Sequence, residues 1–301
     1  MLLSAVILLR AQETTVLPSH LAKAAHALFL SLVASADAEI GARLHDESGP
    51  RPFTVSDLMG LPRRGRNAFA TPGLSCLLRF TSYDDALSSL LLEQVLPQLP
   101  ADVELDNSPF SVEGVLLEEG AHPLSGQTSY DELAEQCLLS AKRPPSRVKL
   151  FFASPTTFRS QGKNVPLPLP GLVFGSLAER WNAFSSIAIY PEVRQYAEEC
   201  LAIAQCHVQT RTVQVAGGKQ VGFVGSCTYA ALRHDPYWLR VMGLLAAFAF
   251  YAGVGYKTTM GLGQTYPRPF PTERSRHADT SPTGHSNHRA TRDGDPQTSH
   301  L

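Results

Sequence analysis

Tyr251-Ala-Gly-Val-Gly-Tyr-Lys-Thr-Thr-Met-Gly-Leu-Gly-Gln-Thr265 contains a glycine loop, in which two Gly-x-Gly pairs lie on either side of five residues. A backbone rich in glycine can approach other groups closely and adopt positive φ angles. The apolar run at 238–251 predicts a buried helix before the loop, and 262–267 predicts a short strand after it. Phosphate-binding loops of nucleotide-binding folds run in the opposite order, from strand to helix, and space their glycines differently. The stretch is therefore not a mononucleotide-binding loop.

The chain has 301 residues and 44% hydrophobic residues, which suggests about two globular domains. Its net charge of −1 gives no global support for nucleic-acid binding, so such a function must depend on local basic clusters. The five cysteines are widely spaced and lack a C-x-x-C pair, as expected for reduced thiols of a cytoplasmic protein. The apolar residues 2–9 are too few to span a membrane and lack the basic flank of a signal peptide.

The first half of the chain predicts the ferredoxin-like order βαββαβ. The expected elements are a strand at 2–10, helices at 20–33 and 36–44, strands at 52–58 and 74–82, a helix at 84–96 and a strand at 110–118. Ser19 is a suitable N-cap for the first helix. We place this domain at residues 1–120 and expect a linker with one short helix at 121–145.

The second half repeats the same order of elements, without a repeat in the sequence itself. The expected elements are a strand at 147–153, helices at 171–183 and 191–204, strands at 206–215 and 220–229, a helix at 236–251 and a strand at 262–267. Gly217 and Gly218 predict the hairpin turn. The predicted fold is α+β, with two tandem ferredoxin-like (RRM-like) domains, the second at 146–270. Residues 271–301 contain almost no apolar residues and are expected to be disordered.

Two histidines in the first half could carry chemistry. His45 ends a predicted helix, and Arg51 follows it in a Ser-Gly-Pro loop. A histidine beside a guanidinium is suited to proton transfer near a phosphate. His26 lies within an Ala/Leu-rich helix, where a lone histidine is more often a packed core residue. Tandem sheets of this type commonly bind single-stranded RNA, but by themselves these residues leave a purely structural role open.

The chain resembles the CRISPR-associated endoribonucleases of the RAMP superfamily, which cut precursor CRISPR RNA within its repeats. The glycine loop matches their C-terminal signature G-x-G-x₅-G-x-G. The resemblance extends over nearly the whole chain except the tail. Four further blocks carry it: Leu44-His-Asp-Glu-Ser-Gly-Pro-Arg-Pro-Phe-Thr-Val-Ser56, Ser154-Pro-Thr-Thr-Phe-Arg159, Phe174-Gly-Ser-Leu-Ala-Glu-Arg-Trp-Asn182 and Gly222-Phe-Val-Gly225.

The resemblance implies RNA cleavage without metal or cofactor, in which a 2′-hydroxyl attacks phosphorus and leaves a 2′,3′-cyclic phosphate and a 5′-hydroxyl. This chemistry requires a base, an acid and a cation for the charged intermediate. The family's catalytic histidine corresponds to His45. Arg51 stands where the family has a lysine, and it keeps the charge but cannot donate a proton. Members without a first-helix tyrosine carry a histidine there, which corresponds to His26. The acid and the base stay unassigned between the two histidines.

The implied partner is CRISPR repeat RNA, both as precursor and as mature guide RNA, with subunits of a CRISPR effector complex as further candidates and no membrane. The sequence leaves monomer and homodimer open. The candidate RNA-binding residues are Gly253, Gly255, Lys257, Gly261 and Gly263 of the glycine loop, Arg63, Arg64 and Arg66 of a basic loop, and Arg159. A solvated surface loop is the alternative for the basic cluster. Because related RAMP proteins share the fold and the glycine loop, the runner-up function is a non-catalytic RNA-binding subunit of a CRISPR effector.

Overall fold

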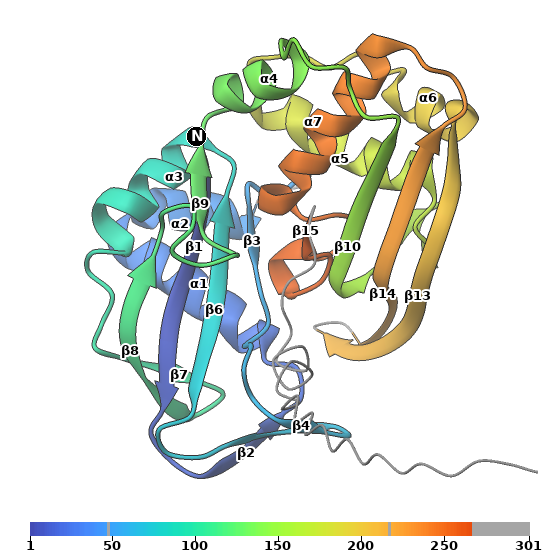
Figure 1. Cartoon of the computed structure of the whole chain (residues 1–301). Coiled ribbons are helices and arrows are strands. Elements are labelled where there is room, and N and C mark those ends of the chain that lie inside the picture. The colour runs from blue at the N-terminus through green and yellow to red at the C-terminus, as the bar shows by residue number, and fades with distance from the viewer. Residues whose placement is uncertain (47–48, 216–217, 267–301) are drawn as a thin grey trace, which may run out of the picture. The chain divides into compact units, whose positions relative to one another are not determined.

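The computed structural model describes residues 1–46, 49–215 and 218–266, which belong to one compact unit (Figure 1). Gly217 of the predicted hairpin turn and the predicted disordered tail at 271–301 lie outside the described residues. The N-terminal half contains β1 (Leu2–Ala11), β2 (Thr15–Pro18), α1 (Ala22–Ala36), α2 (Ala38–Asp46), β3 (Phe53–Val55), β4 (Arg63–Arg64), β5 (Asn67–Ala70), β6 (Ser75–Ser82), α3 (Asp85–Leu90), the π-helical turn η1 (Leu91–Val95), β7 (Asp102–Leu105), β8 (Ser108–Leu116), β9 (Gly126–Thr128) and α4 (Tyr130–Leu138).

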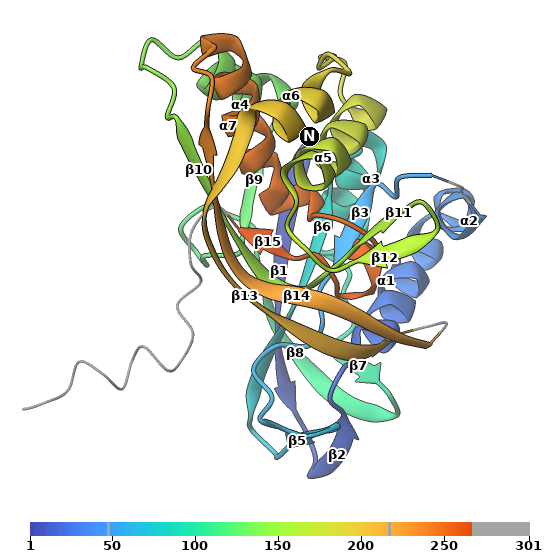
Figure 2. The same cartoon turned by 90° about the vertical axis from the view of Figure 1, so that its right-hand side faces the viewer.

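The C-terminal half belongs to the same compact unit. It contains β10 (Arg147–Thr156), β11 (Phe158–Ser160), β12 (Lys163–Val165), α5 (Pro170–Phe184), α6 (Val193–Cys200), β13 (Leu201–Val215), β14 (Gly218–Ala231), α7 (Pro236–Ala252), the 3₁₀ turn η2 (Thr258–Met260) and β15 (Thr265–Tyr266). Figure 2 shows β13 and β14 as a long ribbon that continues beyond the helices of this half.

Both sheets have ferredoxin-like topology, which confirms the predicted fold class. The order of the first sheet is β3-β6-β1-β8-β7, with β9 also paired to β1, and the order of the second is β13-β14-β10-β15. All of these pairs are antiparallel. In each half the first strand of the βαββαβ unit therefore lies between the third and the fourth.

The apolar run of β1 arises because both faces of its sheet are covered. Leu3, Ala5 and Ile7 pack into the N-terminal core with Phe29 of α1. Leu2 instead joins the C-terminal core, together with side chains of α5 and α7. A strand that is buried on both faces needs no alternation of polar and apolar residues.

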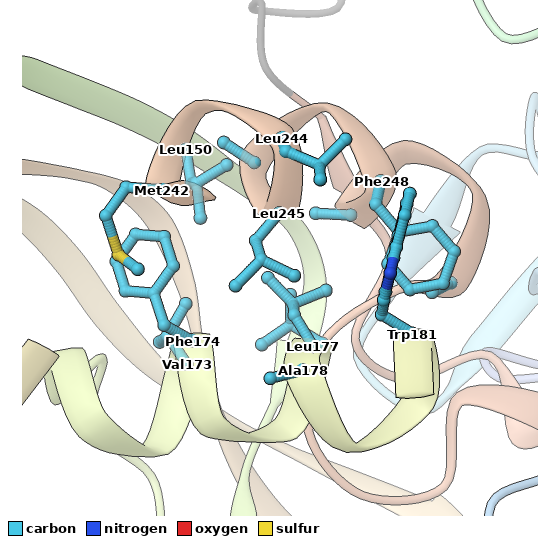
Figure 3. Packing of buried hydrophobic residues seen from close by; sticks show 14 of the residues in the cluster. Leu150, Val173, Phe174, Leu177, Ala178, Trp181, Met242, Leu244, Leu245 and Phe248 are labelled. Atoms are coloured by element: carbon cyan, nitrogen blue, oxygen red, sulfur yellow. The ribbon is translucent and has the colours of Figure 1, made fainter. Parts of the chain in front are cut away.

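The C-terminal core lies between the second sheet and the facing helices α5 and α7 (Figure 3). Trp181 packs edge-to-face against Phe248, with ring centroids 5.2 Å apart. Tyr130 packs edge-to-face against Trp181 at 5.0 Å, so α4 contributes to this core as well. Tyr130, from the helix expected in the linker, is thus part of this core.

The two halves are joined at the C-terminal end of α7, where two side chains of β6 satisfy carbonyl groups of the last turn. The buried Arg79 guanidinium donates to Phe250 O at 2.5 Å and to Gln264 Oε1 at 2.7 Å, and Thr81 donates to Tyr251 O at 2.7 Å. Carbonyls at a helix C-terminus lack intrahelical partners and carry partial negative charge, which favours a cation there. This cap precedes the glycine loop directly and fixes where the loop begins.

The structure corrects the predicted start of the first helix. Ser19 is not its N-cap: Thr15–Pro18 forms β2, and Leu21 is the capping residue without a side-chain bond. Asp57 accepts from the Leu21 N–H at 2.7 Å instead, from a segment that is distant in the sequence. The predicted helix at 191–204 is also shorter, because it ends at Cys200 and β13 begins at Leu201.

Candidate functional site

The glycine loop adopts a conformation that only glycine accommodates readily. Gly253, Gly255, Gly261 and Gly263 have φ angles of 62°, 83°, 78° and 68°. A Cβ atom on Gly263 would lie 2.1 Å from Val254 O. Because positive φ is costly for residues with a Cβ, both backbone strain and close packing require these glycines.

The glycine loop packs against the N-terminal half of the protein. The Gly261 N–H donates to Val55 O at 3.0 Å, and a Cβ on Gly261 would lie 2.5 Å from Ala22 Cβ. The N–H groups of Gly253 and Gly263 donate to Ala249 O at 3.0 Å and Pro155 O at 3.1 Å. Three of the four glycine amides that we expected to face RNA are therefore engaged within the protein.

His26 lies on α1, where the side chain is partly buried. Its ring stacks on Phe53 with a centroid distance of 5.9 Å and an interplanar angle of 13°. Burial lowers the pKa of His26, a backbone hydrogen bond with Thr259 of the glycine loop opposes this shift, and the positive charges of Arg51 and His45 lower the pKa further. Arg51 and His45 therefore lie near enough to His26 to influence its pKa, and the bond with Thr259 places His26 beside the glycine loop.

One atom of the His26 ring stands out chemically. Nδ1 is buried and has no hydrogen-bond partner among the described residues. Buried polar atoms nearly always have a partner, so each exception calls for an explanation. A neutral imidazole nitrogen without a donor is a proton acceptor, but burial keeps this one from direct contact with a substrate.

Arg51 closes the end of the helix that carries His45. Its guanidinium donates to Leu44 O and, at 3.4 Å, to His45 O in the last turn of α2. The buried Tyr83 hydroxyl donates to the Arg51 carbonyl. The cation expected from the sequence is thus anchored near His45, and it also stabilises the helix terminus on which His45 lies.

Sequence reasoning missed a polar cluster under the glycine loop. His20 is close to Asp57 through Nδ1 and Oδ2 at 3.2 Å and to Met260 O through Nε2 at 3.3 Å. Asp57 also accepts from Arg63 at 2.9 Å, and Arg63 donates to Ser19 O at 2.9 Å. No local motif links these residues, because the contacts join segments that are distant in the chain. The cluster holds the turn that carries Thr259 next to His26.

The remaining basic candidates are distributed over separate elements. Arg63 and Arg64 form β4, and Arg64 and Arg66 are exposed. Arg159 of β11 lies over the Tyr256 ring at 5.5 Å, and Lys257 Nζ lies 5.6 Å from the same ring. Arg63 already bonds to Asp57 and Ser19 in the polar cluster. Of the three arginines in the basic loop, it is therefore the one least available for RNA.

In the part of the chain that the structure describes, no helix is long and apolar enough to cross a membrane. The five cysteines are all free thiols. Within the same described residues, no group of three or more histidine, cysteine and carboxylate side chains is arranged to hold a metal ion.

Comparison with known proteins identifies two matching family models. The model described as CRISPR-associated endoribonuclease Cas6 matches residues 150–265, and the CRISPR Cas6 N-terminal domain matches residues 1–133. A CRISPR-associated endoribonuclease Cas6 of Mycobacterium tuberculosis is 30% identical over 130 residues, which are 42% of this chain and 41% of that protein. One of Streptococcus thermophilus is 28% identical over 168 residues, 54% of this chain and 63% of that protein. The aligned segments thus span less than two thirds of the length of these relatives.

Solved structures are similar over almost their full length. The structure of a Cas6 product complex superposes with a TM-score of 0.73 at 29% sequence identity. The match covers 88% of this chain and 98% of the Cas6 chain in that complex. A product complex of a second Cas6 protein has a TM-score of 0.71 at 27% sequence identity. This match covers 88% of this chain and 99% of the second Cas6 chain. A Cas6-related protein from Pyrococcus furiosus, at 13% identity and a TM-score of 0.58, shares the fold.

Proposed function

The chain belongs to the Cas6 family of CRISPR-associated endoribonucleases, and we propose that it cleaves precursor CRISPR RNA within its repeats to produce guide RNAs. One observation carries the proposal: Arg51 contacts the end of α2 at His45, and both residues lie near enough to His26, beside the glycine loop, to influence its pKa. Solved complexes of similar Cas6 proteins with a product and with a substrate mimic support an RNA ligand for the same fold.

The proposed reaction is a metal-independent transesterification. A base removes the proton of a 2′-hydroxyl, which attacks the adjacent phosphorus, and an acid protonates the departing 5′-oxygen. The products are a 2′,3′-cyclic phosphate and a 5′-hydroxyl. Arg51 supplies the positive charge that stabilises the charged intermediate.

We assign the base to His26 and the acid to His45. Because burial lowers the pKa of His26 below its ordinary value of 6.5, the ring is neutral at neutral pH and can accept a proton. His45 is exposed at the end of α2, a position from which it can reach a bound substrate.

RNA contacts are proposed for the exposed Arg64 and Arg66 of the β4–β5 hairpin and for Lys257 and Arg159 at the glycine loop. Positively charged side chains position the backbone of a nucleic acid through its phosphates. Since most glycine amides of the loop donate within the protein, phosphates would be held there by the basic side chains. We also propose a cytoplasmic location, where precursor CRISPR RNA is processed, and we retain effector subunits and a homodimer as candidate partners.

The test uses labelled repeat RNA incubated with the protein in EDTA. Cleavage is expected, and His45→Ala is expected to slow single-turnover cleavage by about 100-fold or more while RNA binding persists. His234→Ala is the matched control, because this histidine is exposed in the connection between β14 and α7. Cleavage by His45→Ala at the wild-type rate removes His45 from the mechanism. Binding by the wild type without cleavage instead favours a non-catalytic RNA-binding subunit.

A further inference from the structure

A pocket of about 320 Å³ opens next to the two residues that precede Arg51. Gly49 and Pro50, directly before Arg51, form one part of its wall, and Gly255 and Tyr256 of the glycine loop form another. Arg159 of β11 and the helices α5 and α6 complete it. The pocket therefore adjoins the segment that leads into Arg51 and the start of the glycine loop.

The charges of the pocket favour an anionic ligand. Arg159, Arg180 and Arg194 line it with a single carboxylate, Glu179. Arg180 donates to Gly255 O, which holds its guanidinium in place, whereas Arg194 is in an exposed ion pair with Glu198 at 3.2 Å. Arg159 and Arg180 therefore supply most of the positive charge that faces a ligand. Guanidinium groups bind phosphate oxygens through several N–H donors at once.

The pocket also offers an aromatic surface. Tyr256 is partly exposed, and its backbone N–H is fixed to Thr157 O at 2.8 Å. The guanidinium of Arg159 lies 5.5 Å from the ring centroid. Proteins recognise unpaired bases by stacking them on aromatic rings and on guanidinium planes. The combination of a stacking surface and phosphate-binding arginines is typical of a nucleotide site.

The size of the pocket limits what it can hold. Its volume lies near the lower end of the roughly 300–1,000 Å³ of small-molecule pockets, which suits one nucleotide but excludes a base-paired stem. Glu179 on α5 can only accept hydrogen bonds when ionised. Guanine can donate two parallel hydrogen bonds to a carboxylate, from N1–H and from its amino group, whereas uracil donates one, from N3–H. Glu179 therefore favours guanine over uracil.

We propose that this pocket binds one unpaired nucleotide directly next to the scissile phosphate, with its base against Tyr256 and its amino group toward Glu179. The inference rests on the proposed function, because it assigns the nucleotide to the RNA that the chain cleaves. It adds a specificity site to the reaction: a nucleotide seated in the pocket holds the neighbouring phosphate at the catalytic cluster.

The binding test uses repeat RNA with a 2′-deoxy sugar at the cut position, which removes the nucleophile and keeps the RNA intact. Fluorescence anisotropy then measures the dissociation constant without cleavage. Tyr256→Ala is expected to weaken binding about tenfold, and Tyr256→Phe is expected to bind as the wild type does. Tyr190→Ala is the control, because this tyrosine is 64% exposed and lies outside the pocket. Thermal denaturation confirms that each variant is folded.

The specificity test varies the nucleotide on each side of the cut and measures single-turnover cleavage. The wild type is expected to discriminate against uracil at one of the two positions, and Glu179→Gln, whose amide also offers a donor, is expected to lose most of that discrimination. Wild-type binding by Tyr256→Ala together with unchanged base preference in Glu179→Gln overturns the pocket assignment. A wild type that binds the RNA but does not cleave it overturns the proposed function alone, since the binding test still applies.

Discussion

Replacing Arg79 with methionine is expected to lower the free energy of unfolding by about 3 kcal/mol. The Arg79 side chain is 1% exposed and joins the two halves of the protein. Besides its contacts with Phe250 O and Gln264 Oε1, it donates to Ser4 Oγ at 2.8 Å. Its guanidinium also lies 4.4 Å from the centroid of the Phe250 ring. Methionine approximates the length of the aliphatic stem but has no donor.

The magnitude follows from the acceptors that the substitution leaves behind. Phe250 O and Gln264 Oε1 would lose the arginine donor, and each unsatisfied buried acceptor costs about 1–3 kcal/mol. Removing a buried charge returns part of this cost, because burial disfavours the charged guanidinium and lowers the pKa of Arg79. The acceptor at the end of α7 should contribute most, since it also loses a favourable interaction with the helix dipole.

Urea denaturation measures this effect. With a slope of about 3 kcal/mol per molar urea for a chain of this size, the midpoint should fall by about 1 M. Arg10→Met is the matched control, because Arg10 lies on the neighbouring strand β1 in an exposed ion pair with Glu113. Exposed pairs contribute little, so its midpoint should stay near that of the wild type. Equal midpoints for Arg79→Met and Arg10→Met would refute the idea that Arg79 locks the halves together.

Two further outcomes are expected from the glycine loop and from His26. Gly261→Ala should destabilise the protein by about 1–3 kcal/mol, because the new Cβ would clash with Ala22 and the φ angle of Gly261 is 78°. Thermal denaturation measures the effect. Gly243→Ala is the control, because a Cβ at Gly243 would have nothing within 4 Å. The unfolded chain should bind more protons than the folded state below about pH 6.5, because burial lowers the pKa of His26 in the fold. Stability should therefore fall as the pH falls from 7.5 to 5.5, and less steeply in His26→Gln; equal slopes would contradict a depressed pKa.

The fold was largely predictable because its local signals agree with its tertiary structure. The apolar run of β1, the glycine loop and the long helix before it are recognisable from composition alone, and their order matches the ferredoxin-like pattern. The short strands at 15–18 and 67–70 were missed. They form a small sheet with Arg63–Arg64 outside the two main sheets, and short strands carry too few residues to show a period.

The candidate site was predictable only in part. Arg51 follows His45 by six residues, so their proximity was visible in the sequence. His26 could be paired with them only through the resemblance, since a histidine on an apolar helix gives no signal of its own. The role of Asp57 was not visible at all. It replaces Ser19 as the acceptor at the start of α1, and this contact depends on how the chain folds back on itself.

The position of His26 gives the glycine loop a second explanation. Met260 O is held by His20, a contact that spans 240 residues of sequence, and the Gly261 N–H is held by Val55 O. Between these anchors and the end of α7 lies Thr259, whose backbone bonds to His26. A side chain at Gly261 would press on α1, the helix that carries His26. Gly261 is therefore required for the fit between the two halves, and a substitution there should displace the proposed base even if Gly261 does not contact RNA.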